Sequence, residues 1–189
     1  MHGNVITMNV PAVQILLAIT EQAVLIKVQG KASFAISTDF KTVVQELRKR
    51  RHQNFLIDVS ECPLMDSTFL GVLAGLGIES GSENSAPDNR PIKLVNPTSR
   101  VSDLLESLGV SHLFTLVRGP IPSEVSGQLI PAASGAHSKV EVSRTCLQAH
   151  ETLMALNPGN VAKFKDVARF LAEDIRRLES GADSTVPGA

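Results

Sequence analysis

The sequence is poor in aromatic residues and in cysteine. The 189-residue chain has no tryptophan and no tyrosine, so phenylalanine alone supplies its 4% of aromatic residues. A hydrophobic fraction of 43% still predicts a packed core, and that core must be built mainly from aliphatic side chains. Two cysteines, Cys62 and Cys146, are too few for a disulfide framework, and neither belongs to a metal-ligand motif. We therefore expect reduced thiols in a cytoplasmic protein that uses no metal and no other cofactor.

Charge and hydropathy argue against a nucleic-acid-binding protein and against a membrane protein. The formal net charge is −1, and a direct nucleic-acid interface would need a basic excess or stacking aromatics. An early apolar stretch, residues 13–19, is far shorter than the roughly 20 residues of a membrane span, so no membrane insertion is expected. The chain shows no glycine-rich phosphate loop, nucleophile motif or metal-ligand set. We therefore expect a protein that is not an enzyme and has no catalytic residues.

Alternating apolar segments predict an α/β fold. Short runs rich in Val, Ile and Leu are typical of strands, and apolar residues at steps of three and four are typical of helices. Their order, β-β-α-β-α-β-α-β, predicts a mixed sheet of about five strands with helices packed on it. The expected strands are 13–19, 23–29, 55–59, 92–95 and 113–117, and the expected helices are 37–51, 66–80 and 98–108.

Composition divides the chain into five segments. The expected segments are an N-terminal arm (1–11), the α/β domain (12–118), a linker rich in Pro, Ser and Gly (119–139), a helical hairpin (140–180) and a tail (181–189). Two apolar stripes separated by a turn are typical of an αα-hairpin. Such a hairpin could pack on the first domain, cover a face of the sheet or form a homodimer.

One motif identifies a family. The strand Phe-Leu-Ile-Asp-Val-Ser at 55–60, followed by Leu-Met-Asp-Ser-Thr-Phe-Leu-Gly-Val-Leu at 64–73, resembles the central motif of STAS domains. These domains occur in bacterial anti-sigma factor antagonists and related regulators. The resemblance spans about residues 13–118, including Asn96-Pro97 and the Leu-x-x-Leu-Gly that ends at Gly109. It implies a STAS-like fold and a role in signal transduction and transcription regulation through protein–protein interaction.

The resemblance implies a modification site. Ser67 follows the second Asp of the motif and matches the position that is phosphorylated in many family members; Thr68 is the neighbouring alternative. A phosphate in the first turn of a helix is tolerated by its own protein, and it adds about −1.5 to −2 charge at pH 7. The simpler interpretation is that Asp66 or Ser67 only caps the helix.

Other motif positions are expected to contact a partner, namely Asp58, Asp66, Phe69 and Leu70. Phe69 departs from the family pattern, which usually has glycine there, so its ring either fills the core or stands at the partner surface. Asp58 and Asp66 could instead be a carboxylate pair for Mg²⁺ or for acid–base chemistry.

The resemblance also implies partners. In the family, the kinase is usually an anti-sigma factor of the GHKL ATPase type, and a PP2C-type phosphatase reverses the modification. The unphosphorylated antagonist binds the anti-sigma factor, and phosphorylation abolishes the binding. An alternative is a constitutive scaffold subunit of a larger complex, such as a lipid-transport ATPase or a signalling assembly, whose binding would ignore the state of Ser67.

Overall fold

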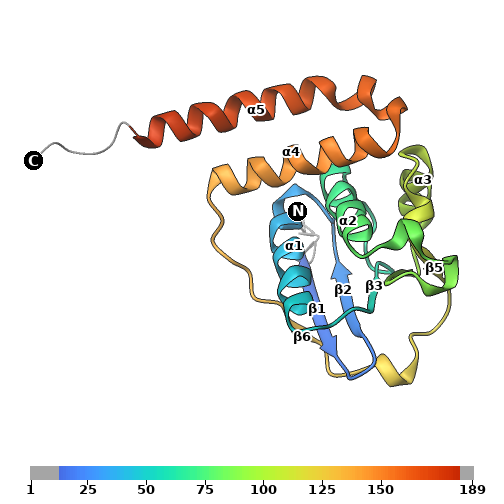
Figure 1. Cartoon of the computed structure of the whole chain (residues 1–189). Helices are drawn as coiled ribbons and strands as arrows, with labels where there is room; N and C mark the ends of the chain where they lie inside the picture. The colour runs from blue at the N-terminus through green and yellow to red at the C-terminus, as the bar shows by residue number, and fades with distance from the viewer. Residues whose placement is uncertain (1–12, 184–189) are drawn as a thin grey trace, which may run out of the picture.

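A six-stranded mixed sheet forms the framework of the computed structural model, which describes residues 13–183 (Figure 1). Its strands are β1 (Gln14–Ile19), β2 (Val24–Gln29), β3 (Phe55–Asp58), β4 (Ile92–Val95), β5 (Thr115–Val117) and β6 (Ile130–Pro131). They lie in the order β5-β4-β3-β2-β1-β6. β1 is antiparallel to β2 and β6, whereas β2 to β5 are mutually parallel. The predicted α/β fold is therefore confirmed, with one short edge strand more than the sequence indicated.

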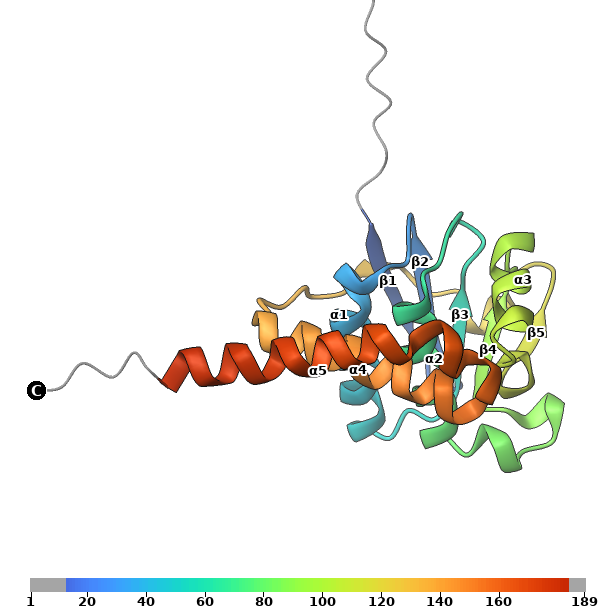
Figure 2. The same ribbon diagram turned by 90° about the horizontal axis from the view of Figure 1, so that it is seen from above.

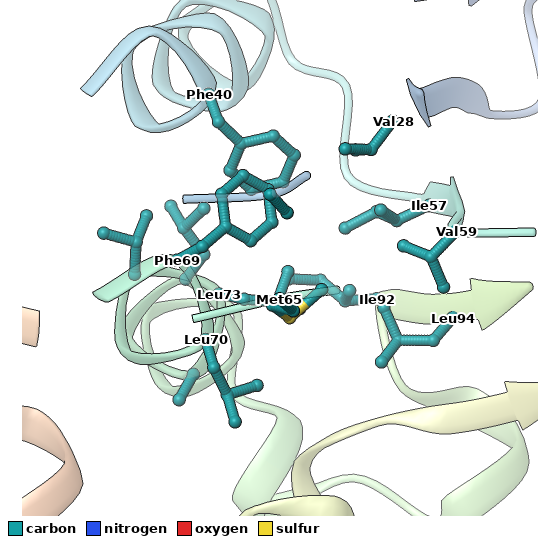
Figure 3. Close-up of a cluster of buried hydrophobic side chains, with 14 of the residues drawn as sticks. Val28, Phe40, Ile57, Val59, Met65, Phe69, Leu70, Leu73, Ile92 and Leu94 are labelled. Carbon is teal, nitrogen blue, oxygen red and sulfur yellow. The ribbon is translucent and has the colours of Figure 1, made fainter. Parts of the chain in front are cut away.

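Three helices cover one face of this sheet. They are α1 (Phe34–Lys49), α2 (Ser67–Glu79) and α3 (Ser99–Ser107). Alternate strand residues face them because side chains on a strand point to opposite faces in turn. The strand residues in this core are Ile15, Leu17, Val24, Ile26, Val28, Phe55, Ile57, Ile92 and Leu94. Figure 3 shows several of these side chains meeting side chains of α1 and α2.

Helix boundaries follow local capping chemistry. α3 begins and ends where the sequence indicates: the Thr98 side chain accepts a hydrogen bond from the Val101 amide at 3.3 Å, and Gly109 follows the helix with a φ of 72°. α1 begins at Phe34, three residues before the expected start, because the extended residue Ser33 is its N-cap. The expected strands and helices are otherwise found with small shifts at their ends.

The segment after β5, expected to be a linker, is ordered by contacts with the domain. It contributes β6 and a 3₁₀ turn (Ser123–Val125), and Val125 is buried. Further along, Asp39 of α1 accepts hydrogen bonds from the Gly135 amide at 2.9 Å and the Ser134 hydroxyl at 2.9 Å, and its Oδ1 lies 2.7 Å from His137 Nε2. The chain that leads into the hairpin is therefore attached to α1.

The predicted hairpin consists of α4 (Lys139–Leu156) and α5 (Val161–Asp183), joined by a 3₁₀ turn at Pro158–Asn160. Both views show α4 lying across α1 and α2 with α5 beside it, and the C-terminal part of α5 running past α4 (Figures 1 and 2). The hairpin thus covers helices and not a face of the sheet. Among residues 13–183, no helix combines the length and the apolar character of a membrane span.

Two expected segments lie wholly or partly outside the described residues. These are the N-terminal arm at 1–11 and, in the tail, residues 184–189. Residues 181–183 of the expected tail belong to α5.

Candidate functional site

Asp66 joins the N-termini of two helices. Its Oδ1 accepts a hydrogen bond from the Phe69 amide at 2.9 Å, which caps α2, and its Oδ2 accepts one from the Phe34 amide at 2.8 Å, which caps α1. A parallel bridge between Ala32 and Met65 brings the two chain segments together. The carboxylate therefore satisfies two amides that have no partner within their own helices. Of the three roles considered for Asp66, which were capping, partner contact and a carboxylate pair, the structure shows capping.

Ser67 is the first residue of α2 and is partly exposed. Its Oγ lies 3.1 Å from Nε2 of His150, a buried residue of α4. The other ring nitrogen of His150, Nδ1, lies 2.8 Å from the Cys146 carbonyl oxygen. Because a carbonyl only accepts, Nδ1 carries a hydrogen, and Nε2 is the ring nitrogen that shares a hydrogen bond with the Ser67 hydroxyl. The candidate switch residue is thus hydrogen-bonded to the C-terminal hairpin.

His150 is the site residue that the sequence did not reveal. It lies 83 positions after Ser67, and no local pattern links two residues that far apart. Its ring packs against Phe164 of α5 with centroids 4.9 Å apart. The sequence offers one weak signal only, since His150 lies beside the apolar stripe of Cys146, Ala149 and Leu153 on the same helix.

Phe69 and Leu70 belong to the core, which corrects the expectation that they contact a partner. Both side chains are fully buried, and the Phe69 ring packs on Phe40 with centroids 4.7 Å apart (Figure 3). The aromatic residue that replaces the family's usual glycine therefore fills space between α1, α2 and the sheet. A side chain without exposed surface cannot form a docking contact unless the domain opens.

Asp58 is also buried, at 2% exposure, so it is not a surface contact either. Its Oδ1 accepts the Ser60 amide at 3.0 Å, and its Oδ2 lies 3.8 Å from the Lys27 ammonium. Lys27 also pairs with Glu61, and this hydrogen bond, together with both carboxylates, raises the pKa of Lys27 although partial burial acts against it. Asp58 is therefore part of an ion-pair cluster at the end of β3.

Thr68, the alternative modification site, is less accessible than Ser67. Its side chain is buried, at 6% exposure, and hydrogen-bonds with the Cys146 thiol. Ser67 lies partly exposed on the same turn.

Asp58 and Asp66, considered above as a carboxylate pair for Mg²⁺, are each engaged by protein hydrogen-bond donors. Asp66 is engaged by two backbone amides and Asp58 by an amide and a lysine. Within residues 13–183, no cluster of three or more His, Cys, Asp or Glu side chains is placed to hold a metal ion.

Two exposed apolar side chains flank Asp66. Phe34, the first residue of α1, is 55% exposed, and Leu64, two residues before Asp66, is 41% exposed. Both side chains are accessible to solvent close to the turn that carries Asp66 and Ser67. Phe69 and Leu70, two of the expected partner contacts, are buried, whereas Phe34 and Leu64 are exposed.

The structure thus has an α/β domain in which Asp66 caps the second helix and Ser67 begins it. The family model described as "Mlab, STAS domain" matches residues 15–118, which is more than half of the chain. The chain therefore belongs to the STAS domain family. The hairpin lies after the matched residues.

Two solved structures show weak likeness to the chain. A candidate anti-sigma factor antagonist from Thermotoga maritima gives a TM-score of 0.47 at 18% identity, covering 56% of this chain and 86% of its own. The anti-sigma factor antagonist SpoIIAA in its unphosphorylated form gives 0.43 at 15% identity, covering 60% and 92%. Among curated proteins no match was found. The assignment to the family therefore depends on the family model.

Proposed function

We propose that this protein is a protein-binding regulator of the anti-sigma factor antagonist type, switched by phosphorylation of Ser67. The observation that carries the proposal is the position of Ser67 at the N-terminus of α2, next to the capping carboxylate of Asp66. Its partners by family resemblance are an anti-sigma factor with GHKL kinase activity and a PP2C-type phosphatase. The regulator itself supplies binding and a hydroxyl group, and no chemistry of its own.

The phosphorylation step needs ATP as donor. The Ser67 oxygen forms a bond to the γ-phosphorus, the bond from that phosphorus to the bridging oxygen breaks, ADP leaves, and the hydroxyl proton passes to a base of the kinase. Free amides at the start of α2 stabilise an anion there. The added charge of about −1.5 to −2 stands next to Asp66 and repels a partner that had packed against this helix end.

The surface that meets the partner would consist of Phe34 and Leu64 around Asp66 and Ser67. The two apolar side chains are exposed, and the segments that carry them are hydrogen-bonded to each other through Ala32 and Leu64. Replacing either with alanine should weaken capture of the partner without unfolding the domain, because neither belongs to the buried core.

The first test is peptide mapping of protein purified from its native host. We expect the mass of one phosphoryl group on Ser67 in part of the protein, and none on this peptide in Ser67→Ala. A Ser67 that stays unmodified under every growth condition, or equal labelling of Ser67→Ala, would refute the switch. Partner binding should fall in Ser67→Asp and persist in Ser99→Asp, which adds the same charge at the first residue of α3.

A constitutive scaffold is the second candidate, because the hairpin extends beyond the residues that match the family model. This role predicts a partner that co-purifies with the protein and stays bound to Ser67→Asp. The comparison of Ser67→Asp with Ser99→Asp therefore discriminates between the two functions.

A homodimer through the C-terminal helices stays a prediction. The stripe of α4 is used within the chain, so the remaining apolar surface lies on α5, where Val167 is 42% and Phe170 is 61% exposed. Light scattering should give a dimer mass that Phe170→Ser reduces to the monomer value. A monomeric parent protein would refute the dimer.

A further inference from the structure

The face of α2 that points away from the sheet, called its outer face here, is apolar and is buried by another helix. This helix carries no charged residue before Glu79, and nine of its thirteen residues are buried. A helix that is apolar on all sides must be covered on all sides. The sheet and α1 cover its inner side, and α4 covers the face that bears Ser67, Gly71 and Gly75. This face begins at the proposed switch residue.

Glycine lets α4 approach α2 closely. A Cβ atom built on Gly71 would collide with the Ala149 carbonyl oxygen and lie 2.7 Å from the carbonyl carbon and 2.8 Å from the Ala149 Cβ. Four residues on, a Cβ atom on Gly75 would meet only the Thr152 hydroxyl at 3.9 Å. The two helices are therefore in backbone contact at Gly71, one turn after Ser67.

The Ser67–His150 hydrogen bond closes this interface at its edge. Its length of 3.1 Å leaves no space for a phosphoryl group between Oγ and Nε2. A phosphoryl group on Ser67 would overlap the His150 ring, and the Asp66 carboxylate beside it adds like-charge repulsion. The docked position of α4 and a phosphoryl group at the site of this hydrogen bond therefore exclude each other.

We infer that the α4–α5 hairpin (residues 139–183) is a releasable cover of the outer face of α2, and that a negative charge on Ser67 releases it. With the hairpin docked, α4 occupies this face and engages Ser67. The exposed side chains Phe34 and Leu64 lie outside the covered face, so the hairpin and the partner surface proposed above are separate. The inference rests on the proposed function, since the modification of Ser67 that ends partner binding would also release the hairpin.

The two cysteines of the chain provide the test. Cys146 lies in the interface between α4 and α2 at 9% exposure, and Cys62 lies in the core of the domain at 0%. Burial raises the pKa of both thiols, so both should react slowly with iodoacetamide in the closed protein. Alkylation of each cysteine is followed over time by peptide mass spectrometry. Reaction of Cys146 alone reports hairpin release, whereas reaction of both reports unfolding.

We expect Cys146 to react at least about tenfold faster in Ser67→Asp than in the parent protein, with Cys62 still protected. Ser99→Asp, the matched charge on the first residue of α3, should leave both rates unchanged. The added charge near Cys146 disfavours its thiolate, so an increase in rate cannot come from a more reactive thiol. An unchanged Cys146 rate in Ser67→Asp would overturn the inference.

A second pair of variants opens the interface without charge. Gly71→Ala should expose Cys146 through the collision with Ala149, whereas Gly75→Ala should leave it protected because space exists there. If Cys62 reacts as fast as Cys146 in Gly71→Ala, the hairpin is an inseparable part of the core and the inference fails.

The thiol assay uses no kinase, so its outcome is separate from that of the proposed function. Release of the hairpin in Ser67→Asp, combined with a Ser67 that is never phosphorylated, would refute the proposed switch and leave the releasable hairpin standing. Phosphorylation of Ser67 with Cys146 still protected would refute the releasable hairpin alone.

Discussion

Asp66 and Ser67 are adjacent in sequence but have different tasks. The aspartate is used structurally, because both of its oxygens accept amides of helix N-termini. The serine leaves the capping to its neighbour, so its hydroxyl is free to bond to His150. This division matters for regulation, because a modification of Ser67 leaves the caps of α1 and α2 intact. A serine that itself capped α2 could not be modified without loss of the cap.

Replacement of Asp66 should therefore cost more than replacement of an ordinary cap. In Asp66→Ala two amides lose their acceptor, and we expect the free energy of unfolding in urea to fall by about 2 to 3 kcal/mol. Asp66→Asn keeps one oxygen and should lose less. The control is Thr98→Ala on α3, which removes a single 3.3 Å cap and should cost about 1 kcal/mol. Equal losses in Asp66→Ala and Thr98→Ala would show that the bridge to α1 adds nothing.

At the scale of elements, sequence patterns predicted the features that depend on local chemistry. Thr98 and Gly109 define α3 because a cap and a left-handed residue act within one turn. The pattern could not decide whether Phe69 is core or surface, since the answer depends on space left beside Phe40 of α1. Nor could it find β6, because two residues such as Ile130 and Pro131 carry no periodicity. The contact between His150 and Ser67 could not be predicted either, because it depends on how α4 packs against α2.

The turn of the hairpin is attached to the domain through Asn160. Its buried side-chain amide donates to the Leu108 carbonyl, just after α3, and to the Leu153 carbonyl of α4, both at 2.9 Å. Lys163 Nζ lies 3.4 Å from its Oδ1. This end of the hairpin is therefore fixed by polar contacts, while near Ser67 the helix α4 is held by the hydrogen bond to His150 and by one from Lys41 of α1 to Gln148 at 2.5 Å. Release as proposed above would begin at Ser67, where the charge is added.

Asn160→Asp should loosen the turn. The substitution leaves two buried carbonyls without their donor and places a carboxylate against them, which Lys163 offsets only in part. We expect a loss of about 2 to 4 kcal/mol in the free energy of unfolding. Asn157→Asp in the same turn keeps the oxygen that accepts the Gly159 amide and loses only a long hydrogen bond of 3.5 Å to the Leu108 carbonyl, so it should cost less than about 1 kcal/mol. Thermal unfolding of both variants measures the difference, and similar melting temperatures would contradict the anchoring role of Asn160.

For the whole molecule, the connection between domain and hairpin limits how far the hairpin can move. Asp39 holds residues 134, 135 and 137 against α1, directly before α4 begins at Lys139. A hairpin released from α2 would therefore stay attached close to the surface that it had covered. Its high local concentration would favour return once the charge on Ser67 is removed.

This attachment should weaken in acid. Burial acts to raise the pKa of Asp39, but hydrogen bonds from Gly135, His137 and Ser134 outweigh it and lower this pKa below its ordinary value. A carboxyl group with a lowered folded-state pKa contributes stability that is present above its unfolded pKa of about 4 and is lost as the pH falls through the folded value. The free energy of unfolding should therefore decline below about pH 4.

Asp39→Asn isolates this contribution. The variant should be less stable than the parent at pH 7 by about 1 to 2 kcal/mol, because a charged acceptor of three hydrogen bonds becomes neutral. The difference should shrink between about pH 4 and pH 2.5, where the parent's carboxyl group also loses its charge. Urea titrations across this range measure it, and Asp103→Asn, at an exposed site on α3, is the control. A difference between Asp39→Asn and the parent that stays constant with pH would show that the carboxylate's charge does not hold the connection.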